Sequence, residues 1–331
     1  MDRVNMTCPQ DIKDCTMTLT CPTLTCPCRR ARGFTHIELL VAMAILFLIV
    51  AQMAPAMMQV REVARRSQCQ NNLKMIGLAL HNYHDVYSLL PPGFVVRNWE
   101  TSAQQGFGWQ VSILPYIDQA PAFNLIRPDG GGLGDAVQDQ ARQGAMMTRV
   151  SEYRCPADIT PDKNEFRKGW PTSNYSGNAG YEPFPRLASD VVSQYWPGKL
   201  PSPRNGLHLG QRTGLFAVNS AVGFRRITDG TSRTLMVGER GMMSYSGIWV
   251  GVTAASNEND QLTDVSHLSR PNRSTRGFSS YHPNSFHALM CDGAVRRIDA
   301  AIDSQPNDDP KKPLGVLQRL GGINDGQVVE F

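Results

Sequence analysis

RRARGFTHIELLVAMAILFLIV, residues 29–50, is the stretch of sequence on which the fold depends. It opens with three arginines, reaches Gly33, and continues as an apolar run with one carboxylate, Glu38, near its start. No charged residue occurs from Leu39 to Val60, and a helix of that length, rising about 1.5 Å per residue, matches a bilayer core of about 30 Å. Arginines before such a helix favour a cytoplasmic N-terminus. We therefore predict a transmembrane helix over residues 34–60.

A cleaved secretory signal peptide and a plain membrane anchor are the alternatives to be weighed. Signal peptides have an apolar region of about 7 to 15 residues and then a small-x-small cleavage site. Here the run is longer, and the nearest such site, Ala54-Pro55-Ala56, contains an unfavourable proline. Neither alternative explains Glu38, because an unpaired carboxylate in hydrocarbon costs several kcal/mol unless it is neutralised or paired. Cleavage after Gly33 would expose an amine that can pair with this carboxylate on a neighbouring chain.

The octapeptide Gly33-Phe34-Thr35-His36-Ile37-Glu38-Leu39-Leu40 resembles the processing site of type IV prepilins and of type II secretion pseudopilins. The resemblance implies that a membrane aspartic peptidase cleaves between Gly33 and Phe34 and then N-methylates Phe34. It also implies that Glu38 acts in assembly and that residues 1–33 are a leader that is removed.

Two further positions bear on this resemblance. Pro55 matches the proline that kinks the pilin helix, whereas His36 stands where the family usually has an apolar residue. The implied partners are the prepilin peptidase/N-methyltransferase, homologous pilin-like subunits that meet through the N-terminal helix, and the membrane itself.

The helix is expected to continue beyond the membrane as an amphipathic segment over residues 61–90. Apolar residues recur there at helical spacings, and Glu62 can meet a basic residue one turn later. The recurring residues are Leu73, Ile76, Leu80 and Tyr87, and the basic ones are Arg65 and Arg66. Pro91-Pro92-Gly93 is expected to end the helix near Tyr87.

Two groups of possible metal ligands are better explained without a metal. Five of the eight cysteines precede residue 30 without forming a C-x-x-C pair, so they read as part of a disposable leader. His81 and His84 are three residues apart on the helix, but no third ligand is evident nearby, which favours a surface or interface role. We predict no metal and no cofactor.

The part from residue 91 to residue 331 reads as an exported, β-rich and loop-rich domain. Glycine and proline are frequent, and short apolar runs alternate with turn signals. Loops are expected at Gly130-Gly131-Gly132 and over residues 256–276, and a strand in RTLMVGE after the Asp229-Gly230 turn. FHALMC and AVRRI flank an Asp-Gly pair and predict a hairpin. The predicted class is α+β, with a long N-terminal helix packed on this domain.

Several motifs after the apolar run resemble a large bacterial family of prepilin-like proteins, whose soluble domain is called solute-binding-like or of unknown function. These motifs are CQNNLKMIGLALHNYHD, LPPG, WQVSILPYIDQ, YRCPAD, NYSGNAG, ITDGTSRTLMVGE and HPNSFHALMCDGAVRRID. His282 precedes Asp292 and Gly293 as in the family's H-x(9)-D-G pattern. In a functional interpretation, His282 and Asp292 form a binding or active site. We favour the structural one, in which Asp292 forms a turn and His282 is a hydrogen-bonded residue at a strand end.

A mature exported chain would retain three cysteines in an oxidising compartment. Cys291 lies in the apolar hairpin and is expected to be buried. Cys69, on the exposed part of the helix, and Cys155, in a turn-like CPAD, are the better disulfide pair. Such a bridge would stabilise the fold by about 4 kcal/mol in the chain-entropy model.

The functional prediction is a structural subunit of a type II secretion or type IV pilus-like assembly in the bacterial inner membrane. The chain would cross once, with the C-terminal domain periplasmic or at the cell surface. The alternative is a membrane-tethered or pilus-displayed module that binds a glycan, a peptide or a surface. An enzyme is not expected, because the chain has no G-x-S-x-G, H-E-x-x-H or P-loop motif. A net charge of +4 without a basic stripe argues against nucleic-acid binding.

Overall fold

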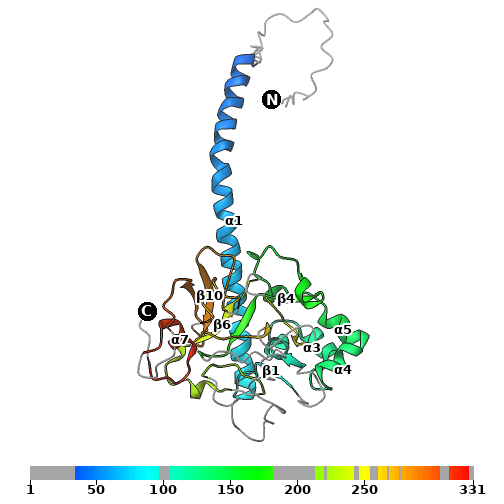
Figure 1. Cartoon of the computed structure of the whole chain (residues 1–331). Helices are drawn as coiled ribbons and strands as arrows, with labels where there is room; N and C mark the ends of the chain where they lie inside the picture. Colours follow the sequence, from blue (N-terminus) through cyan, green and yellow to red (C-terminus); the bar gives the residue numbers. More distant parts are fainter. Residues whose placement is uncertain are drawn as a thin grey trace, which may run out of the picture. The chain divides into compact units, whose positions relative to one another are not determined.

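The structure, a computed structural model, describes residues 34–96, 105–181, 213–219, 222–241, 246–253, 260–266, 268–275, 277–305 and 313–327, without the side chains of 52–59. By its internal contacts the chain divides into two units, residues 1–56 and 57–331. Figure 1 shows a mixed architecture of helices and short strands, which agrees with the predicted α+β class.

The helices of the described part are one long helix and several short ones. The α-helices are α1 (His36–Tyr87), α2 (Trp109–Ser112), α3 (Ala120–Ile126), α4 (Leu133–Gln138), α5 (Gln140–Met146) and α7 (Val316–Gly321). The 3-10 turns are η1 (Leu114–Tyr116), η2 (Ser151–Tyr153), η3 (Glu165–Arg167), η5 (Phe224–Arg226) and η6 (Thr231–Arg233).

The strands of the described residues form one sheet of five and two sheets of three. The five-stranded sheet has the order β11 (Val295–Asp299), β10 (Ser285–Met290), β6 (Leu235–Glu239), β5 (Tyr175–Asn178) and β9 (Leu262–Thr263). All its pairs are antiparallel except β5 with β9. The smaller sheets join β1 (Phe94–Val95), β2 (Gly106–Gly108) and β8 (Gly251–Val252), and β3 (Lys163–Asn164), β4 (Trp170–Ser173) and β7 (Gly247–Ile248).

A capping box starts α1. The Thr35 backbone N–H donates to Glu38 Oε2 at 2.9 Å, and the Glu38 N–H donates to Thr35 Oγ1 at 3.4 Å. This reciprocal pair satisfies two amides that the first helical turn would otherwise leave without partners. At the other end, Ser88 adopts a left-handed conformation with φ 58° and the helix stops. The predicted helix to Tyr87 is confirmed, and it ends before Pro91-Pro92-Gly93.

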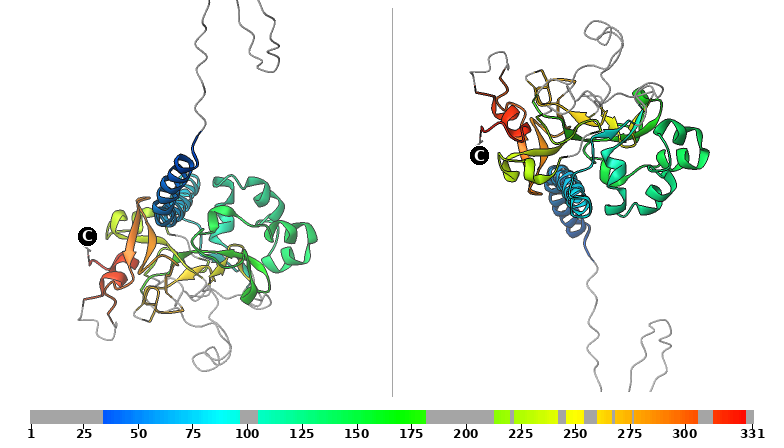
Figure 2. Two further views of the ribbon diagram at one scale, coloured as in Figure 1. Left: turned by 90° about the horizontal axis from the view of Figure 1, so that it is seen from above. Right: turned by 90° about the horizontal axis from the view of Figure 1, so that it is seen from below.

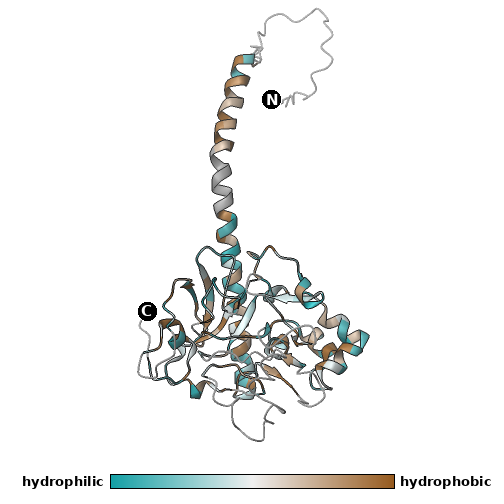
Figure 3. Ribbon diagram, in the orientation of Figure 1, coloured by the Kyte–Doolittle hydropathy of each residue, from teal (hydrophilic) through white to brown (hydrophobic). Residues whose placement is uncertain are grey.

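The first turns of α1 expose their apolar side chains, which Figure 3 shows as a mostly brown stretch. Ile37, Leu46, Phe47 and Val50 are 60–74% exposed, and their apolar neighbours are at least half exposed. Within the part of the chain that the structure describes, no helix is both long and apolar enough to cross a membrane. The predicted span over residues 34–60 is thus not confirmed, and the side chains of 52–59 lie outside the described ones.

The last turns of α1 belong to the core of the second unit. Cys69, Leu73, Ile76 and Leu80 are fully buried and recur every three or four residues, so they form one face of the helix. Figures 1 and 2 show this part of α1 between strands β6 and β10 on one side and helices α3–α5 on the other. The predicted apolar face of the helix is confirmed for Leu73, Ile76 and Leu80, which are buried. Tyr87 was expected on the same face but is 57% exposed.

Residues 109–146 are largely helical, contrary to the expectation of a β-rich domain from residue 91 onward. Helices α3, α4 and α5 are only six or seven residues long, so each shows little helical periodicity in the sequence. Asp139 caps α5 by accepting from the amides of Ala141 and Arg142. Strand β9 is a second correction, because it lies within the loop expected over residues 256–276.

The hairpin and the RTLMVGE strand are confirmed. Strands β10 and β11 pair antiparallel from Ser285 opposite Asp299 to Leu289 opposite Val295. The turn between them contains Gly293 at φ 85°, a left-handed conformation that glycine adopts at little cost. Strand β6 covers most of RTLMVGE and pairs with β10 on one side and β5 on the other. Cys291, just after β10, is buried and free as expected.

The C-terminal segment after α7 is held by the Asp229 carboxylate. Asp229 accepts from the backbone N–H of Asp325 at 2.7 Å and from that of Gly326 at 3.0 Å. Burial is the main cause that raises the pKa of Asp325 to about 6, and the nearby Asp229 carboxylate adds to it, although the N–H of Gln327 opposes the shift. The folded state therefore binds this proton more tightly than the unfolded state.

We expect Asp325→Asn to stabilise the protein at pH 8 and to have little effect near pH 4. The pKa of Asp325 is about 4 in the unfolded chain and about 6 in the folded one, so the folded state loses stability as pH rises between these two values. Asparagine carries no charge and avoids this loss. Since the side chain is only half-buried, we expect a gain of about 1 kcal/mol rather than the full shift. Urea unfolding of both forms across pH measures this, and an equal difference at pH 4 and pH 8 would contradict it.

Candidate functional site

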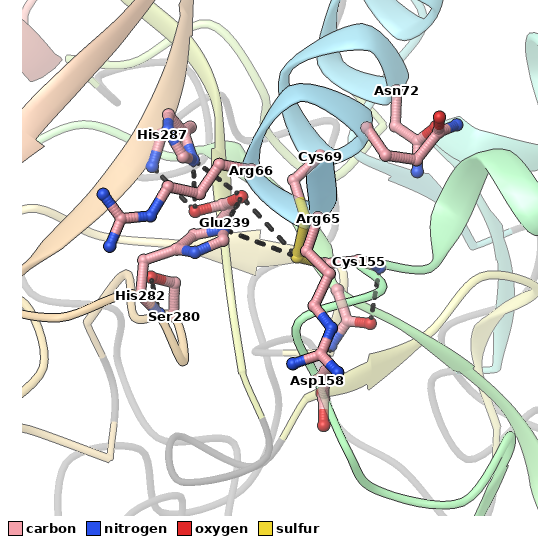
Figure 4. The surroundings of a disulfide bond; sticks show 12 residues. Arg65, Arg66, Cys69, Asn72, Cys155, Asp158, Glu239, Ser280, His282 and His287 are labelled. Atoms are coloured by element: carbon pink, nitrogen blue, oxygen red, sulfur yellow. Dashed lines mark hydrogen bonds and ion pairs between the residues drawn. A yellow bond between two sulfur atoms is a disulfide. The ribbon is translucent and has the colours of Figure 1, made fainter. Parts of the chain in front are cut away.

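Four side chains with potential metal-ligand atoms meet inside the second unit. They are Cys69, Cys155, Glu239 and His282, all buried, with one ligand atom of each within 4.8 Å of the others. Figure 4 shows them converging from different parts of the chain, with dashed lines from His287 to the Glu239 carboxylate. We refer to these four residues as the Cys–Glu–His cluster.

Different elements supply each member of the cluster. Cys69 lies on the buried face of α1, and Glu239 is the last residue of β6. Cys155 follows η2, where its N–H donates to Asn174 Oδ1 at 3.0 Å. His282 lies before β10, and its N–H donates to Ser280 Oγ at 3.1 Å. The cluster thus joins α1 to the five-stranded sheet.

A disulfide joins Cys69 to Cys155, whose Cα atoms are 5.0 Å apart and whose positions differ by 86 in the sequence. This is the pair that the sequence suggested. Cys69 is fully buried, although the sequence placed it on an exposed part of the helix. The reason is that Cys69 falls on the same helical face as Leu73 and Ile76, which the core covers. Nearby, Asn72 Nδ2 donates to the Arg154 carbonyl at 2.7 Å, so the helix and the Cys155 loop are joined twice.

The Glu239 carboxylate is held from two sides. Its Oε2 accepts the His287 N–H at 2.7 Å, and the His287 ring Nδ1 lies 3.1 Å from Oε1. His282 Nε2 lies 3.6 Å from the same Oε1. Burial raises the pKa of Glu239, but hydrogen bonds and charge from His282 and His287 outweigh it, so the net pKa is lowered. Glu239 is therefore an anion in the protein interior with histidine partners.

His282 bridges two carboxylates. Its Nδ1 lies 3.3 Å from Glu62 Oε1 on α1, while its Nε2 points to Glu239 and to the disulfide. Burial lowers the pKa of His282, but Glu239 and Glu62 together overcome that, and the net pKa is raised. Glu62 also meets Arg66 at 3.2 Å and Arg65 at 3.9 Å, the helical pairs that the sequence predicted.

Asp292 and Gly293 lie apart from this cluster. Asp292 is exposed, and its Oδ1 accepts the Ala294 N–H at 2.9 Å within the turn between β10 and β11. Among the described contacts, none links Asp292 to His282. Asp292 therefore has the structural role in a turn that the sequence analysis favoured. His282 precedes a strand as expected, but it also contacts Glu62, Glu239 and the disulfide.

The predicted processing and assembly residues lie at the start of the chain's described part or beyond it. Gly33 lies outside the described residues, as does the side chain of Pro55. Phe34 is 89% exposed and precedes α1. Glu38 lies in the first turn of α1, also exposed, where its carboxylate completes the capping box with Thr35.

The remaining candidate ligands take other roles. His81 and His84 pack their rings against Phe224, with ring centroids 5.0 Å and 4.4 Å away. The early cysteines lie outside the described residues. Asp229, which the sequence places in the turn before RTLMVGE, holds the C-terminal segment.

The sequence did not predict three contacts of the cluster: that of Glu62 with His282, that of His287 with Glu239, and that of His282 with Glu239. Glu62 is 220 positions from His282, and local patterns carry no information about such a contact. The signal for Glu239 was present, since a carboxylate that ends an apolar strand in a buried sheet requires a partner. Thr35-x-x-Glu38 also has the spacing of a capping box, a second signal that was missed.

Comparison with known proteins identifies one family. Its sequence model, described as a protein of unknown function (DUF1559), matches residues 58–305, about three quarters of the chain. The match contains all four residues of the Cys–Glu–His cluster, but it does not include the segment from Phe34 to Glu38. No curated protein and no solved structure matches the chain.

Proposed function

The chain belongs to the DUF1559 family of proteins of unknown function, and from that premise we propose that it is a pilin-like subunit of the bacterial envelope. A prepilin peptidase would remove residues 1–33 and methylate the new amine of Phe34. The segment 34–60 would hold the subunit in the inner membrane until assembly, with the second unit periplasmic or at the cell surface. In this proposal the chain is a substrate of the peptidase and catalyses no reaction itself.

The exposed apolar surface of α1 is the observation that carries the proposal. From Ile37 to Val50 the large apolar side chains are each at least half exposed. An apolar surface of this extent marks a site for lipid or for another protein chain. The sequence continues without a charged residue to Val60, and lipid before assembly and neighbouring helices afterwards are the natural covers of the exposed apolar surface.

Glu38 supplies the specific contact in this proposal. Its carboxylate is exposed, four positions after Phe34 in the sequence, and the Phe34 backbone nitrogen becomes a free amine if the chain is cleaved after Gly33. Within a chain, the Glu38 carboxylate already accepts the Thr35 N–H. A carboxylate has further lone pairs, so it can accept from the Phe34 amine of a neighbour while it caps its own helix. The gain is large in a bundle of apolar helices because water does not screen the pair.

The second unit is consistent with export. Its Cys69–Cys155 disulfide is of a kind that persists in oxidising compartments and is rare in the cytosol. Membership in the family is consistent with a pilin-like extracytoplasmic module and does not assign a more specific role.

Co-expression with a prepilin peptidase tests the processing step. We expect the wild-type chain to lose its first 33 residues and the Gly33→Val variant to keep them, because a branched side chain at the cleaved bond blocks access. Ala31→Val, two residues before Gly33, is the matched control and should be processed. Equal processing of the Gly33→Val variant, or no processing of the wild type, would contradict the proposal.

A further inference from the structure

We propose that reduction of the Cys69–Cys155 disulfide turns the Cys–Glu–His cluster into a binding site for Zn²⁺ or a similar thiophilic cation. The four ligands would be the two thiolates, His282 Nε2 and Glu239 Oε1. This inference concerns the second unit alone and does not depend on the proposed role of the N-terminal segment.

The distances in the cluster fit a tetrahedral site. Cys155 Sγ lies 3.9 Å from Glu239 Oε1 and 3.8 Å from His282 Nε2, and the last two atoms are 3.6 Å apart. A tetrahedral zinc ion with sulfur, nitrogen and oxygen ligands needs separations of about 3.3–3.8 Å between them, from bond lengths of about 2.0–2.3 Å. Three of the four ligands therefore need to move by only a few tenths of an ångström.

The sulfurs must separate, and the surroundings leave room for that. A small cavity of about 10 Å³ borders Cys155, Glu239, Asp158 and Tyr281. That space is about the size of one water molecule, and its lining includes Cys155 but not Cys69, so Cys155 is the sulfur with adjoining space.

Outer hydrogen bonds orient both non-sulfur ligands. Glu62 Oε1 lies against His282 Nδ1, so the opposite nitrogen, Nε2, faces the sulfurs. The His287 backbone N–H donates to Glu239 Oε2, and the His287 ring Nδ1 lies 3.1 Å from Oε1. Oε1 keeps a second lone pair for an ion next to the sulfurs. Metal-bound histidines commonly donate their other ring N–H to a carboxylate, which fixes the tautomer and the ring orientation. The Glu62–His282 pair is such an arrangement.

A dithiol can serve as the reductant of the Cys69–Cys155 disulfide. The dithiol gives two electrons and two protons to the Cys69–Cys155 bond, forming two thiols, and is itself oxidised to a disulfide. Zn²⁺ then replaces the two thiol protons, which leave to solvent, and forms two zinc–sulfur bonds. With the Glu239 carboxylate and a neutral His282, the site carries a net charge of −1. Oxidation reverses both steps and releases the ion.

Metal binding by the full chain in detergent tests the proposal, with Zn²⁺ as the probe and a phosphine as reductant. The chain should carry serine at Cys8, Cys15, Cys21, Cys26 and Cys28 so that these thiols do not bind the ion. Reduction in the presence of zinc avoids dependence on the stability of the reduced, metal-free fold. We expect one zinc per reduced chain and none per oxidised chain. Cobalt in place of zinc should give thiolate-to-metal charge-transfer absorption.

Two comparisons decide the outcome. His282→Gln should bind zinc at least tenfold more weakly, and a Cys69→Ala/Cys155→Ala chain should not bind it at all. Circular dichroism of the oxidised His282→Gln protein, with its disulfide intact, shows that this variant is folded. Zinc binding by the oxidised chain or by the double-alanine chain would overturn the proposal. So would the absence of zinc from the reduced wild type.

Glu62→Gln should weaken zinc binding by about 10- to 100-fold, because the amide orients the His282 ring less strongly than the carboxylate does. Glu62 is a positioning residue, since it touches His282 and would not touch the ion. Glu165→Gln, which removes an exposed carboxylate on η3, is the matched control and should bind zinc as the wild type does. Equal affinity in the Glu62→Gln and Glu165→Gln chains would contradict the role assigned to Glu62.

Discussion

Glu38→Ala is expected to abolish assembly of the subunit while the precursor is still inserted and cleaved. The proposal makes this carboxylate the partner of a neighbour's Phe34 amine, and alanine leaves that amine without a counter-charge among apolar helices. In-membrane crosslinking of whole cells should therefore show multimers for the wild type and only monomers for the variant. Asp85→Ala, which removes an exposed carboxylate from the same helix, is the matched control and should assemble normally.

Glu38→Gln separates the two roles that the structure allows for this residue. Glutamine can still accept the Thr35 N–H and keep the capping box, but it carries no charge. We expect it to fail in assembly as alanine does, because pairing with an amine requires the anion. If glutamine assembles and only alanine fails, Glu38 serves to start the helix, and the assembly role is wrong.

Removal of the Cys69–Cys155 disulfide is expected to lower the free energy of unfolding by about 4–5 kcal/mol. The bridge closes a loop of 86 positions, and the chain-entropy model assigns about that value to such a loop. Urea unfolding of the Cys69→Ala/Cys155→Ala chain against the wild type measures the loss. Cys291→Ala changes a buried, free cysteine and should cost about 1 kcal/mol or less.

A loss below about 1 kcal/mol in the double variant would contradict the view that the bridge restrains the unfolded chain. That result would also mean that the buried contacts of Leu73 and Ile76 suffice to hold α1 on the sheet. The measurement is informative for the zinc proposal as well, since it gives the stability that the reduced chain must recover when it binds the ion.

Elements with strong local signals were predicted from the sequence. The extent of α1 followed from its apolar run and amphipathic repeat, and the β10–β11 hairpin followed from an Asp-Gly turn between two β-capable runs. The Glu62–Arg66 pair followed from helical spacing alone. In each case the residues that decide the structure are close together in the sequence.

The Cys–Glu–His cluster could not be predicted in that way. Glu239 and His282 contact through the packing of β6 and the segment before β10, and Glu62 reaches them only because α1 lies on the same sheet. Contacts of 43 to 220 positions in sequence separation depend on tertiary packing, which no local pattern specifies. The short helices α3–α5 were missed for a different reason, since six or seven residues give too few turns for a periodic signal.

The N-terminal residue of the mature chain tests the central claim most directly. Mass spectrometry of protein from its native host, after proteolysis, identifies the first peptide and any methyl group on it. The proposed function predicts a chain that begins at N-methylated Phe34, with the segment through Glu38 intact behind it. A chain that retains Arg29 to Gly33 would contradict the proposed function.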